Sequence, residues 1–316
     1  MKLMRVLVTG GAGFIGGNLC RRLLEEPAID EVRVIDDLSE GHLRALEGLN
    51  VTFARASILD DEALGRAADG VDAIVHLAAL GSVPRSVSNP VASHQANATG
   101  TLLVLEAARA NNNAHVVLAS SSSVYGANPA IPKVETLQLM PMSPYAVSKM
   151  ASEQYAMAYA NCYDLPVLPF RFFNVFGPGQ MAGHVYAAVI PVFLEAALTG
   201  KPLPVNGDGE QSRDFTYVGT VVETITQALV AKVTATPMNL AFGTRTTLNE
   251  LIRLMCEALS SDLEVTYSDP RPGDVRHSQA GNDLLRAHFP TIEPVPLKNG
   301  LEAAIEWMRQ HLAIAE

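Results

Sequence analysis

Short apolar runs alternate with longer amphipathic segments along the first half of the chain. The short runs have the length of buried strands and lie at residues 3–9, 31–35, 51–54, 72–76, 115–119 and 167–171. Residues 14–26, 59–68 and 90–111 carry apolar positions at helical spacing. Strands that alternate with helices are typical of a parallel sheet covered on both faces. The pattern therefore predicts an α/β fold with a doubly wound, Rossmann-like parallel sheet.

The composition changes after residue 171, where proline and glycine become more frequent. Amphipathic segments at residues 218–231, 247–259 and 301–312 predict further helices. We expect a smaller C-terminal α/β lobe that is built from insertions at the carboxyl edge of the sheet and binds the substrate. The expected division is discontinuous. Residues 1–172 and about 214–242 form the sheet domain, and residues from about 173–213 and 243–316 form the lobe.

Composition excludes several classes of function. The chain has 316 residues, 48% apolar and 18% charged, and a net charge of -10 that disfavours nucleic acid. No apolar run reaches the ~18 residues that span a bilayer, so we expect a cytoplasmic protein without membrane contact. Cys20, Cys162 and Cys256 are too widely spaced for a disulfide framework or a zinc site. The histidines form no metal-ligand cluster either, and His76, which ends an apolar strand, is expected to be a hydrogen-bonded core residue.

A glycine-rich turn, GGAGFIG at residues 10–16, follows the first strand. Glycines let the backbone approach a pyrophosphate at the N-terminus of the next helix, where N–H groups and the helix dipole favour an anion. Such a turn is weak evidence alone. Asp36, however, ends the second strand 20 residues after Gly16, where a carboxylate accepts hydrogen bonds from ribose hydroxyls and repels a 2′-phosphate. The pattern favours NAD over NADP as cofactor.

A second polar group lies where the fifth strand should end. Residues 120–123 are four serines at the edge where open α/β sheets bind ligands. Ser143 and Pro144 favour a helix start, which places Tyr145 and Lys149 on one helix face. Because an ammonium near a phenol favours the phenolate, we expect Lys149 to lower the pKa of Tyr145. Tyr145 could then exchange a proton with a substrate hydroxyl.

Four motifs together resemble the extended short-chain dehydrogenase/reductases, and within them the UDP-hexose 4-epimerases. They are TGGAGFIG at residues 9–16, Ser121 four residues before Tyr125, the pair of Tyr145 and Lys149, and RFFNVFG at residues 171–177. Four further segments most resemble the UDP-N-acetylglucosamine 4-epimerase branch: residues 81–86 (GSVPRS), 187–191 (AAVIP), 206–215 (NGDGEQSRDF) and 273–278 (GDVRHS). The resemblance runs essentially from end to end.

The resemblance implies a redox-neutral 4-epimerisation of UDP-glucose, UDP-N-acetylglucosamine or both. Hydride passes from the sugar C4 to NAD while the Tyr145 phenolate removes the 4-hydroxyl proton. The resulting 4-keto sugar turns, and the hydride returns to its opposite face. Ser121 would hydrogen-bond or relay the proton at O4, and Lys149 would also bind the nicotinamide ribose. A homodimer is implied as well, with helices near residues 90–111 and 145–163 paired across a two-fold axis.

The implied binding residues form two groups. The cofactor group is Gly10, Gly13, Phe14, Ile15, Gly16, Asp36, Ser57, Ile58, Leu77, Ala78, Ala79, Asn97, Tyr145, Lys149 and Phe173. The substrate group is Gly81, Ser82, Ser121, Ser122, Asn174, Ala188, Val189, Asn206, Arg213, Arg271, Asp274 and Ser278. Asn174, the two arginines and Asp274 would hold UDP, since guanidiniums suit a pyrophosphate.

Two departures from the family pattern limit this transfer, and a third residue argues against two related reactions. Ser57 precedes Ile58 where relatives commonly carry an aspartate that contacts adenine. Gly81 replaces a lysine of some epimerases, a change that the acetylated-sugar branch shares. Ser122 follows Ser121 where nucleotide-sugar dehydratases and decarboxylases usually carry an acid, which argues against those reactions.

The identity of the sugar stays open. Ser278 stands where some related epimerases place a bulky tyrosine, so its small side chain predicts room for a 2-acetamido group. A UDP-glucuronate 4-epimerase is an alternative, because one donor can decide carboxylate recognition. A non-catalytic NAD-binding protein is the alternative from another class, and intact Ser121, Tyr145 and Lys149 argue against it.

Overall fold

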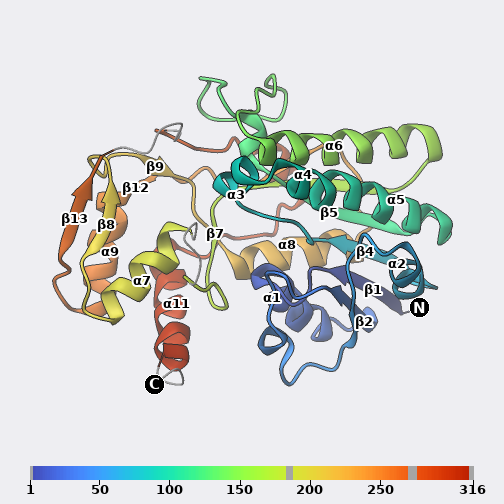
Figure 1. The fold of residues 1–316 in the computed structure, drawn as a ribbon, viewed down its shortest axis with the longest axis horizontal. Coiled ribbons are helices and arrows are strands. Elements are labelled where there is room, and N and C mark those ends of the chain that lie inside the picture. Colours follow the sequence, from blue (N-terminus) through green and yellow to red (C-terminus); the bar gives the residue numbers. More distant parts are fainter. Residues whose placement is uncertain (1–2, 183–187, 270–275, 313–316) are drawn as a thin grey trace.

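The computed structural model describes residues 3–182, 188–269 and 276–312. Within these residues, seven parallel strands form one sheet (Figure 1). Their spatial order is β11 (Met238–Leu240), β6 (Val167–Phe172), β5 (His115–Ser121), β4 (Ala73–His76), β1 (Met4–Thr9), β2 (Ile29–Asp36) and β3 (Thr52–Arg55). The predicted doubly wound sheet is confirmed. The analysis of the apolar runs missed β11, because three residues are too few for a periodic signal.

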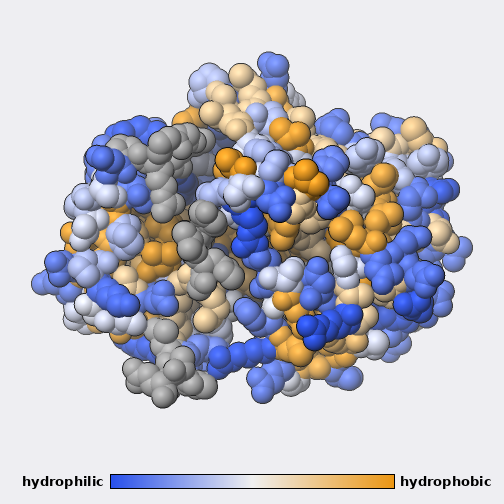
Figure 2. Space-filling model, in the orientation of Figure 1, coloured by the Kyte–Doolittle hydropathy of each residue, from blue (hydrophilic) through white to orange (hydrophobic). Residues whose placement is uncertain are grey.

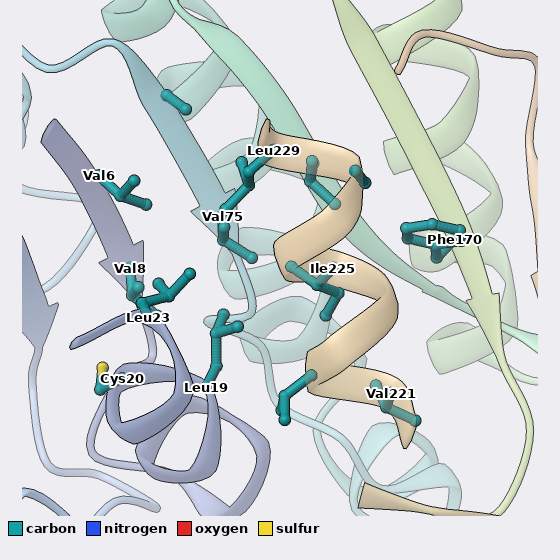
Figure 3. Close-up of a cluster of buried hydrophobic side chains, with 14 of the residues drawn as sticks. Val6, Val8, Leu19, Cys20, Leu23, Val75, Phe170, Val221, Ile225 and Leu229 are labelled. Carbon is teal, nitrogen blue, oxygen red and sulfur yellow. The ribbon is translucent and has the colours of Figure 1, made fainter. Parts of the chain in front are cut away.

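Helices cover both faces of the sheet (Figure 1). One face carries α1 (Phe14–Leu24), α8 (Val218–Val230) and α10 (Asp283–His288), and the other carries α2 (Asp61–Ala68), α5 (Gly100–Ala110) and α6 (Pro144–Tyr163). Figure 3 shows the first face, where Leu19 and Leu23 of α1 and Ile225 and Leu229 of α8 pack near Val75 of β4. Burying one such side chain stabilises the fold by ~1.5–3 kcal/mol. This packing holds α1 and its glycine turn against the strands.

The helix predicted at residues 90–111 contains a π-helical segment. It runs as α4 (Pro90–His94), the π segment η2 (Gln95–Thr99) and α5, and the short α3 (Val83–Ser88) precedes it. A π segment disturbs the regular backbone ladder. The carbonyl of Asn97 also accepts hydrogen bonds from the hydroxyls of Thr101 of α5 (2.6 Å) and Ser152 of α6 (3.1 Å). The bond from Ser152 joins the helix to α6.

Helix α6 begins at the predicted residue. The Ser143 hydroxyl accepts a hydrogen bond from the Ala146 N–H at 3.2 Å, and Pro144 occupies the first turn. The helix ends at Tyr163, after which Asp164 adopts the left-handed conformation with φ 52°. Tyr145 therefore lies in the first turn, where a long and well-capped helix holds it.

The remaining elements gather beside the sheet (Figure 1, left) around a separate apolar cluster that includes Phe193, Leu251 and Leu301. They are the helices α7 (Val189–Leu198), α9 (Leu248–Leu259) and α11 (Leu297–Leu312), and three strand pairs: β7 (Val175–Phe176) with β10 (Thr216–Tyr217), β9 (Ser212–Arg213) with β12 (Thr246–Thr247), and β8 (Leu203–Asn206) with β13 (Val265–Ser268). The single turns η1 (Leu43–Leu46) and η3 (Ser122–Tyr125) lie in loops of the sheet.

The position of helix α10 differs from the one that the expected division of the chain gave it. The sequence analysis placed residues 243–316 in the lobe, but Leu285 of α10 and the following Phe289 pack in the core on the sheet. The ring centroids of Phe289 and Phe170 of β6 are 6.1 Å apart. Apolar burial thus assigns α10 to the sheet layer. No helix in the described part of the chain combines the length and apolar character needed to cross a membrane.

Candidate functional site

The turn after β1 leaves no room for side chains at two of its glycines. Gly10 has φ +72°, and a Cβ there would lie 2.6 Å from the backbone nitrogen of Ala78. A Cβ on Gly16 would lie 2.2 Å from the carbonyl oxygen of Gly10. Gly13 is the N-cap of α1, and no side chain of the described residues caps this helix. The first N–H groups of α1 are therefore available to an anion.

Asp36 is fixed at the end of β2, next to this turn. One carboxylate oxygen accepts from the N–H of Ala12 at 3.0 Å, and the other accepts from the N–H of Leu38 at 2.8 Å. Burial raises the pKa of Asp36, while these two backbone hydrogen bonds oppose the rise. The predicted acid thus lies beside the glycine turn, as a ribose ligand requires.

A cleft of about 330 Å³ opens between this turn and the ends of the neighbouring strands. Eight predicted cofactor residues line it: Gly10, Gly13, Asp36, Ser57, Ile58, Leu77, Ala78 and Ala79. The sequence analysis missed others that line it, namely Ile35, Asp37, Ser39, Glu40, Gly41, Ala56, Leu59, Leu80, Ala92, Gln95 and Ala96. Most of these adjoin a predicted residue in the sequence and could have been found that way. The last three lie on α4 and η2, which only tertiary packing brings to the cleft.

The other predicted cofactor residues do not line this cleft. Phe14 and Ile15 begin α1, and Asn97 joins the loop after β4 to α6 through hydrogen bonds to the Leu80 N–H (2.8 Å) and the Ser148 hydroxyl (2.9 Å). Phe173 is fully buried, and its ring centroid lies 6.3 Å from that of Tyr125. Phe173 therefore supports the site from the core.

Ser121, Tyr145 and Lys149 come together at the carboxyl end of β5. The Ser121 hydroxyl, which donates to the Ser123 hydroxyl at 3.1 Å, lies near the Tyr145 phenol and lowers its pKa. The Lys149 ammonium donates to the carbonyl oxygen of Ala119 at 2.9 Å. A serine, a tyrosine and a lysine so arranged form an acid/base group that can exchange a proton with a substrate hydroxyl.

The pKa of Tyr145 differs from the sequence-based expectation. Burial raises it, and the group that lowers it is Ser121 rather than Lys149. Phenolate is poorly solvated in the interior, and the Lys149 ammonium is directed to the backbone of β5. Burial also lowers the pKa of Lys149 to about 8, so its ammonium is largely charged at neutral pH.

His76 is a core residue, as predicted. Its Nδ1 lies 2.8 Å from the Thr9 hydroxyl and its Nε2 lies 3.0 Å from the Thr101 hydroxyl. Burial, together with the charge of Lys149, lowers its pKa to about 3. The imidazole is therefore neutral at physiological pH and joins β1 and β4 to α5.

Three predicted substrate residues gather around β9. The Asn174 side chain donates to the carbonyl of Asp214 at 3.3 Å, and the Ser278 N–H donates to the carbonyl of Ser212 at 3.0 Å. Arg213 belongs to β9 itself. The group also lies near Ser121, because Ser121 pairs with the last residue of β6, and Asn174 follows that residue by two positions.

Other predicted substrate residues are less closely connected. Ser82 caps α3, and Gly81 beside it is exposed with open space where a side chain would extend. Ser122 begins η3, Ala188 and Val189 begin α7, and Asn206 ends β8, where its carbonyl accepts from Gln211. Arg271 and Asp274 lie outside the described residues.

Comparisons with known proteins show which family the chain resembles. The family model described as "NAD dependent epimerase/dehydratase family" matches residues 6–241. The "UDP-glucose 4-epimerase" of Mycolicibacterium smegmatis is 36% identical over 97% of this chain and 99% of its own length. The "Probable UDP-glucuronate 4-epimerase" of Rhizobium meliloti is 34% identical over 98% of each chain.

The solved structures include the UDP-N-acetylglucosamine 4-epimerase of Methanobrevibacter ruminantium, in complex with UDP-N-acetylmuramic acid. It aligns with a TM-score of 0.92 and 36% identity, and covers 98% of this chain and 100% of its own. The likeness therefore includes both the sheet and the elements beside it.

Proposed function

The chain belongs to the NAD-dependent epimerase/dehydratase family, and we propose that it epimerises a UDP-hexose at C4, with UDP-glucose or UDP-N-acetylglucosamine as substrate. The enzyme is an isomerase, and its cofactor is NAD. The observation that carries the proposal is the meeting of Ser121, Tyr145 and Lys149 at the end of β5.

The chain's residues fit NAD. The glycine turn has no room for Cβ atoms and leads into an uncapped helix N-terminus, which suits a pyrophosphate. The buried carboxylate at the end of β2 suits the adenosine ribose. We assign cofactor binding to residues 1–172 and about 214–242, and UDP-sugar binding to about 173–213 and 243–316, with α10 packed on the sheet. Asn174 and Arg213 would hold the UDP moiety, and the guanidinium suits its diphosphate.

NAD supplies, when bound, the acceptor and later the donor of the C4 hydride. Tyr145 removes the proton from the 4-hydroxyl and returns it after the 4-keto sugar has turned. Ser121, which lies near the phenol, holds O4 or relays this proton. The Lys149 ammonium, which donates to the Ala119 carbonyl at the end of β5, would bind the nicotinamide ribose.

A UDP-glucuronate 4-epimerase is the second candidate, and the Rhizobium relative at 34% identity favours it. The test incubates the purified enzyme separately with UDP-glucose, UDP-N-acetylglucosamine and UDP-glucuronate and separates the 4-epimers. We expect conversion of one or both of the first two sugars. Conversion of UDP-glucuronate alone would establish the second candidate, and no conversion of any sugar would refute the epimerase assignment.

Cofactor selectivity is expected to depend on Asp36. Asp36→Ala should weaken NAD roughly 10- to 100-fold, since a hydrogen bond to a charged group contributes ~1.5–3 kcal/mol, and should weaken NADP less. Calorimetric Kd values for both dinucleotides measure the effect. Asp37→Ala is the control, because Asp37 lines the same cleft but is exposed. Equal loss of NAD and NADP affinity in Asp36→Ala would contradict the role.

We also propose a homodimer that uses α4, α5 and α6. Exposed apolar residues support this surface, because Val87 of α3 is 65% exposed and Val91 of α4 is 64% exposed. Figure 2 shows apolar residues over these two helices. Exposed Val147 and Tyr155 extend the apolar surface along α6.

Light scattering should give twice the 33.8 kDa of one chain. Val91→Glu should shift the protein toward the monomer, because a charge in an apolar interface is costly. Val230→Glu, at an exposed valine of α8 on the other face of the sheet, should not. A wild type that stays monomeric at every concentration would exclude the dimer.

A further inference from the structure

Three consecutive residues at the end of β5 each contact α6. The carbonyl of Ala119 accepts from the Lys149 ammonium at 2.9 Å. The Ser120 hydroxyl donates to a carboxylate oxygen of Glu153 at 2.5 Å. Ser121 lies near the Tyr145 phenol and lowers its pKa. The three helix residues are spaced by four, so they lie on one face of α6 and form three successive contacts with one strand end.

Among the three helix residues, Glu153 is the one that the reaction does not use. It is fully buried, and both of its carboxylate oxygens accept from Arg171 of β6, at 2.9 Å each. The guanidinium continues to the Tyr125 hydroxyl at 2.9 Å, and its Cζ lies 4.9 Å from the centroid of that ring. Glu153 is therefore held directly from β5 and β6, and Arg171, which holds it, is in turn bonded to η3.

Stability alone does not account for such a pair. Removing two charges from water costs several kcal/mol per ion, and apolar residues of similar volume often stabilise a core at least as much as a buried ion pair does. A bidentate pair does fix direction, because the planar guanidinium holds both carboxylate oxygens in place. The Glu153 carboxylate therefore accepts the hydrogen bond from the Ser120 hydroxyl at one fixed position along α6.

Glu153 also acts on the charge of Lys149, which lies one turn earlier on the same helix. Burial lowers the pKa of Lys149 to about 8, and the negative charge of Glu153 opposes that shift. The other groups around the ammonium do not help it. His76 is neutral, Tyr145 is a phenol whose pKa is raised by burial, and Arg171 is positive.

We propose that Glu153 is a positioning residue for the epimerisation: held by Arg171 and bonded to Ser120, its carboxylate keeps α6 in register with the end of β5 and favours the charged ammonium of Lys149. This rests on the proposed function, because Glu153 acts through Tyr145 and Lys149 rather than on the sugar. The two parts of the role can be separated, since Ser120 contributes only to the register.

Glu153→Gln and Ser120→Ala test the two parts in the NAD-loaded enzyme. Glu153→Gln should lower kcat roughly 10- to 100-fold with little change in KM. In its pH–rate profile, the pH at which activity falls on the alkaline side should decrease by roughly one unit, because loss of the negative charge lowers the pKa of Lys149. Ser120→Ala should lower kcat roughly 3- to 10-fold. The alkaline side of its pH–rate profile should not shift, because the Glu153 carboxylate remains.

Glu223→Gln is the matched control. Glu223 lies on α8, on the opposite face of the sheet, and accepts from Arg22 at 2.7 Å. The same substitution there removes the charge of an arginine-paired glutamate far from Lys149 in the fold. It should change neither kcat nor the pH–rate profile.

A readout without substrate keeps the proposal separate from the proposed function. The pKa of Lys149 is measured by NMR titration of its Nζ in ¹⁵N-lysine protein, with Lys149→Met to assign the signal. It should fall in Glu153→Gln and stay unchanged in Ser120→Ala and Glu223→Gln. An unchanged pKa of Lys149 in Glu153→Gln would overturn the proposal even if the wild type epimerises no sugar.

The proposed alignment of α6 with the end of β5 can be refuted separately. If Glu153→Gln does not fold, Ser120→Ala still decides, because it leaves the pair of Glu153 and Arg171 intact. Full wild-type turnover in Ser120→Ala would overturn the proposed alignment of α6. A loss of kcat that equals a loss of folded protein, measured by circular dichroism, would likewise assign Ser120 to stability alone.

Discussion

Tyr145→Phe is expected to lower turnover at least ~100-fold, because a positioned acid/base group typically contributes ~10²- to 10⁴-fold to rate. The phenol is the group that must remove and return the proton of the 4-hydroxyl, and the nearby Ser121 hydroxyl cannot replace it. The variant should fold and retain NAD, since the ring remains and only one oxygen is lost. The measurements are kcat, the melting temperature and the NAD content after denaturation.

Tyr155→Phe is the control for this experiment. Tyr155 lies on the same helix, its side chain is exposed, and the same oxygen is removed. Turnover should stay at the wild-type level. Retention of wild-type turnover by Tyr145→Phe would refute the acid/base role of Tyr145 and the mechanism built on it.

Ser278→Tyr should lower kcat/KM for UDP-N-acetylglucosamine by ~5- to 150-fold, since overpacking costs ~1–3 kcal/mol. The backbone there has little freedom to move away. The N–H of Ser278 donates to the carbonyl of Ser212 at 3.0 Å, and two residues later the N–H of Ala280 donates to the buried carboxylate of Asp214 at 3.0 Å. In our proposal, the larger ring fills the space of the 2-acetamido group.

UDP-glucose should be affected much less, because it has a hydroxyl in place of the acetamido group. The readout is the ratio of kcat/KM for the two sugars in wild type, Ser278→Tyr and Ser278→Ala, where alanine leaves the space open and should keep the ratio. A ratio that does not fall in Ser278→Tyr would remove Ser278 from sugar selection. So would a wild type that never converts the acetylated sugar.

Local features of this protein could be predicted from the sequence. The strands of the sheet from β1 to β6, the glycine turn, Asp36 at the end of β2 and the N-cap of α6 at Ser143 all lie where the patterns predicted them. Each depends on side-chain periodicity, backbone conformation or a cap within a few residues. Such effects involve residues that are close in the sequence, so they do not depend on how the elements pack together.

Contacts between distant segments were decided by the tertiary structure. The π segment around Asn97, the strand β11 and the place of α10 on the sheet each depend on packing that no local pattern contains. The same holds for Glu153, whose partners Ser120 and Arg171 lie 33 and 18 residues away.

The electrostatics of the site show the same limit. The spacing of Tyr145 and Lys149 correctly placed both side chains at one strand end, but it predicted the wrong direction for the pKa of Tyr145. Spacing determines which groups can meet. The pKa depends on how much water the fold removes from the phenol and on where the Lys149 ammonium is directed, and both follow from the packing of α6 against β5.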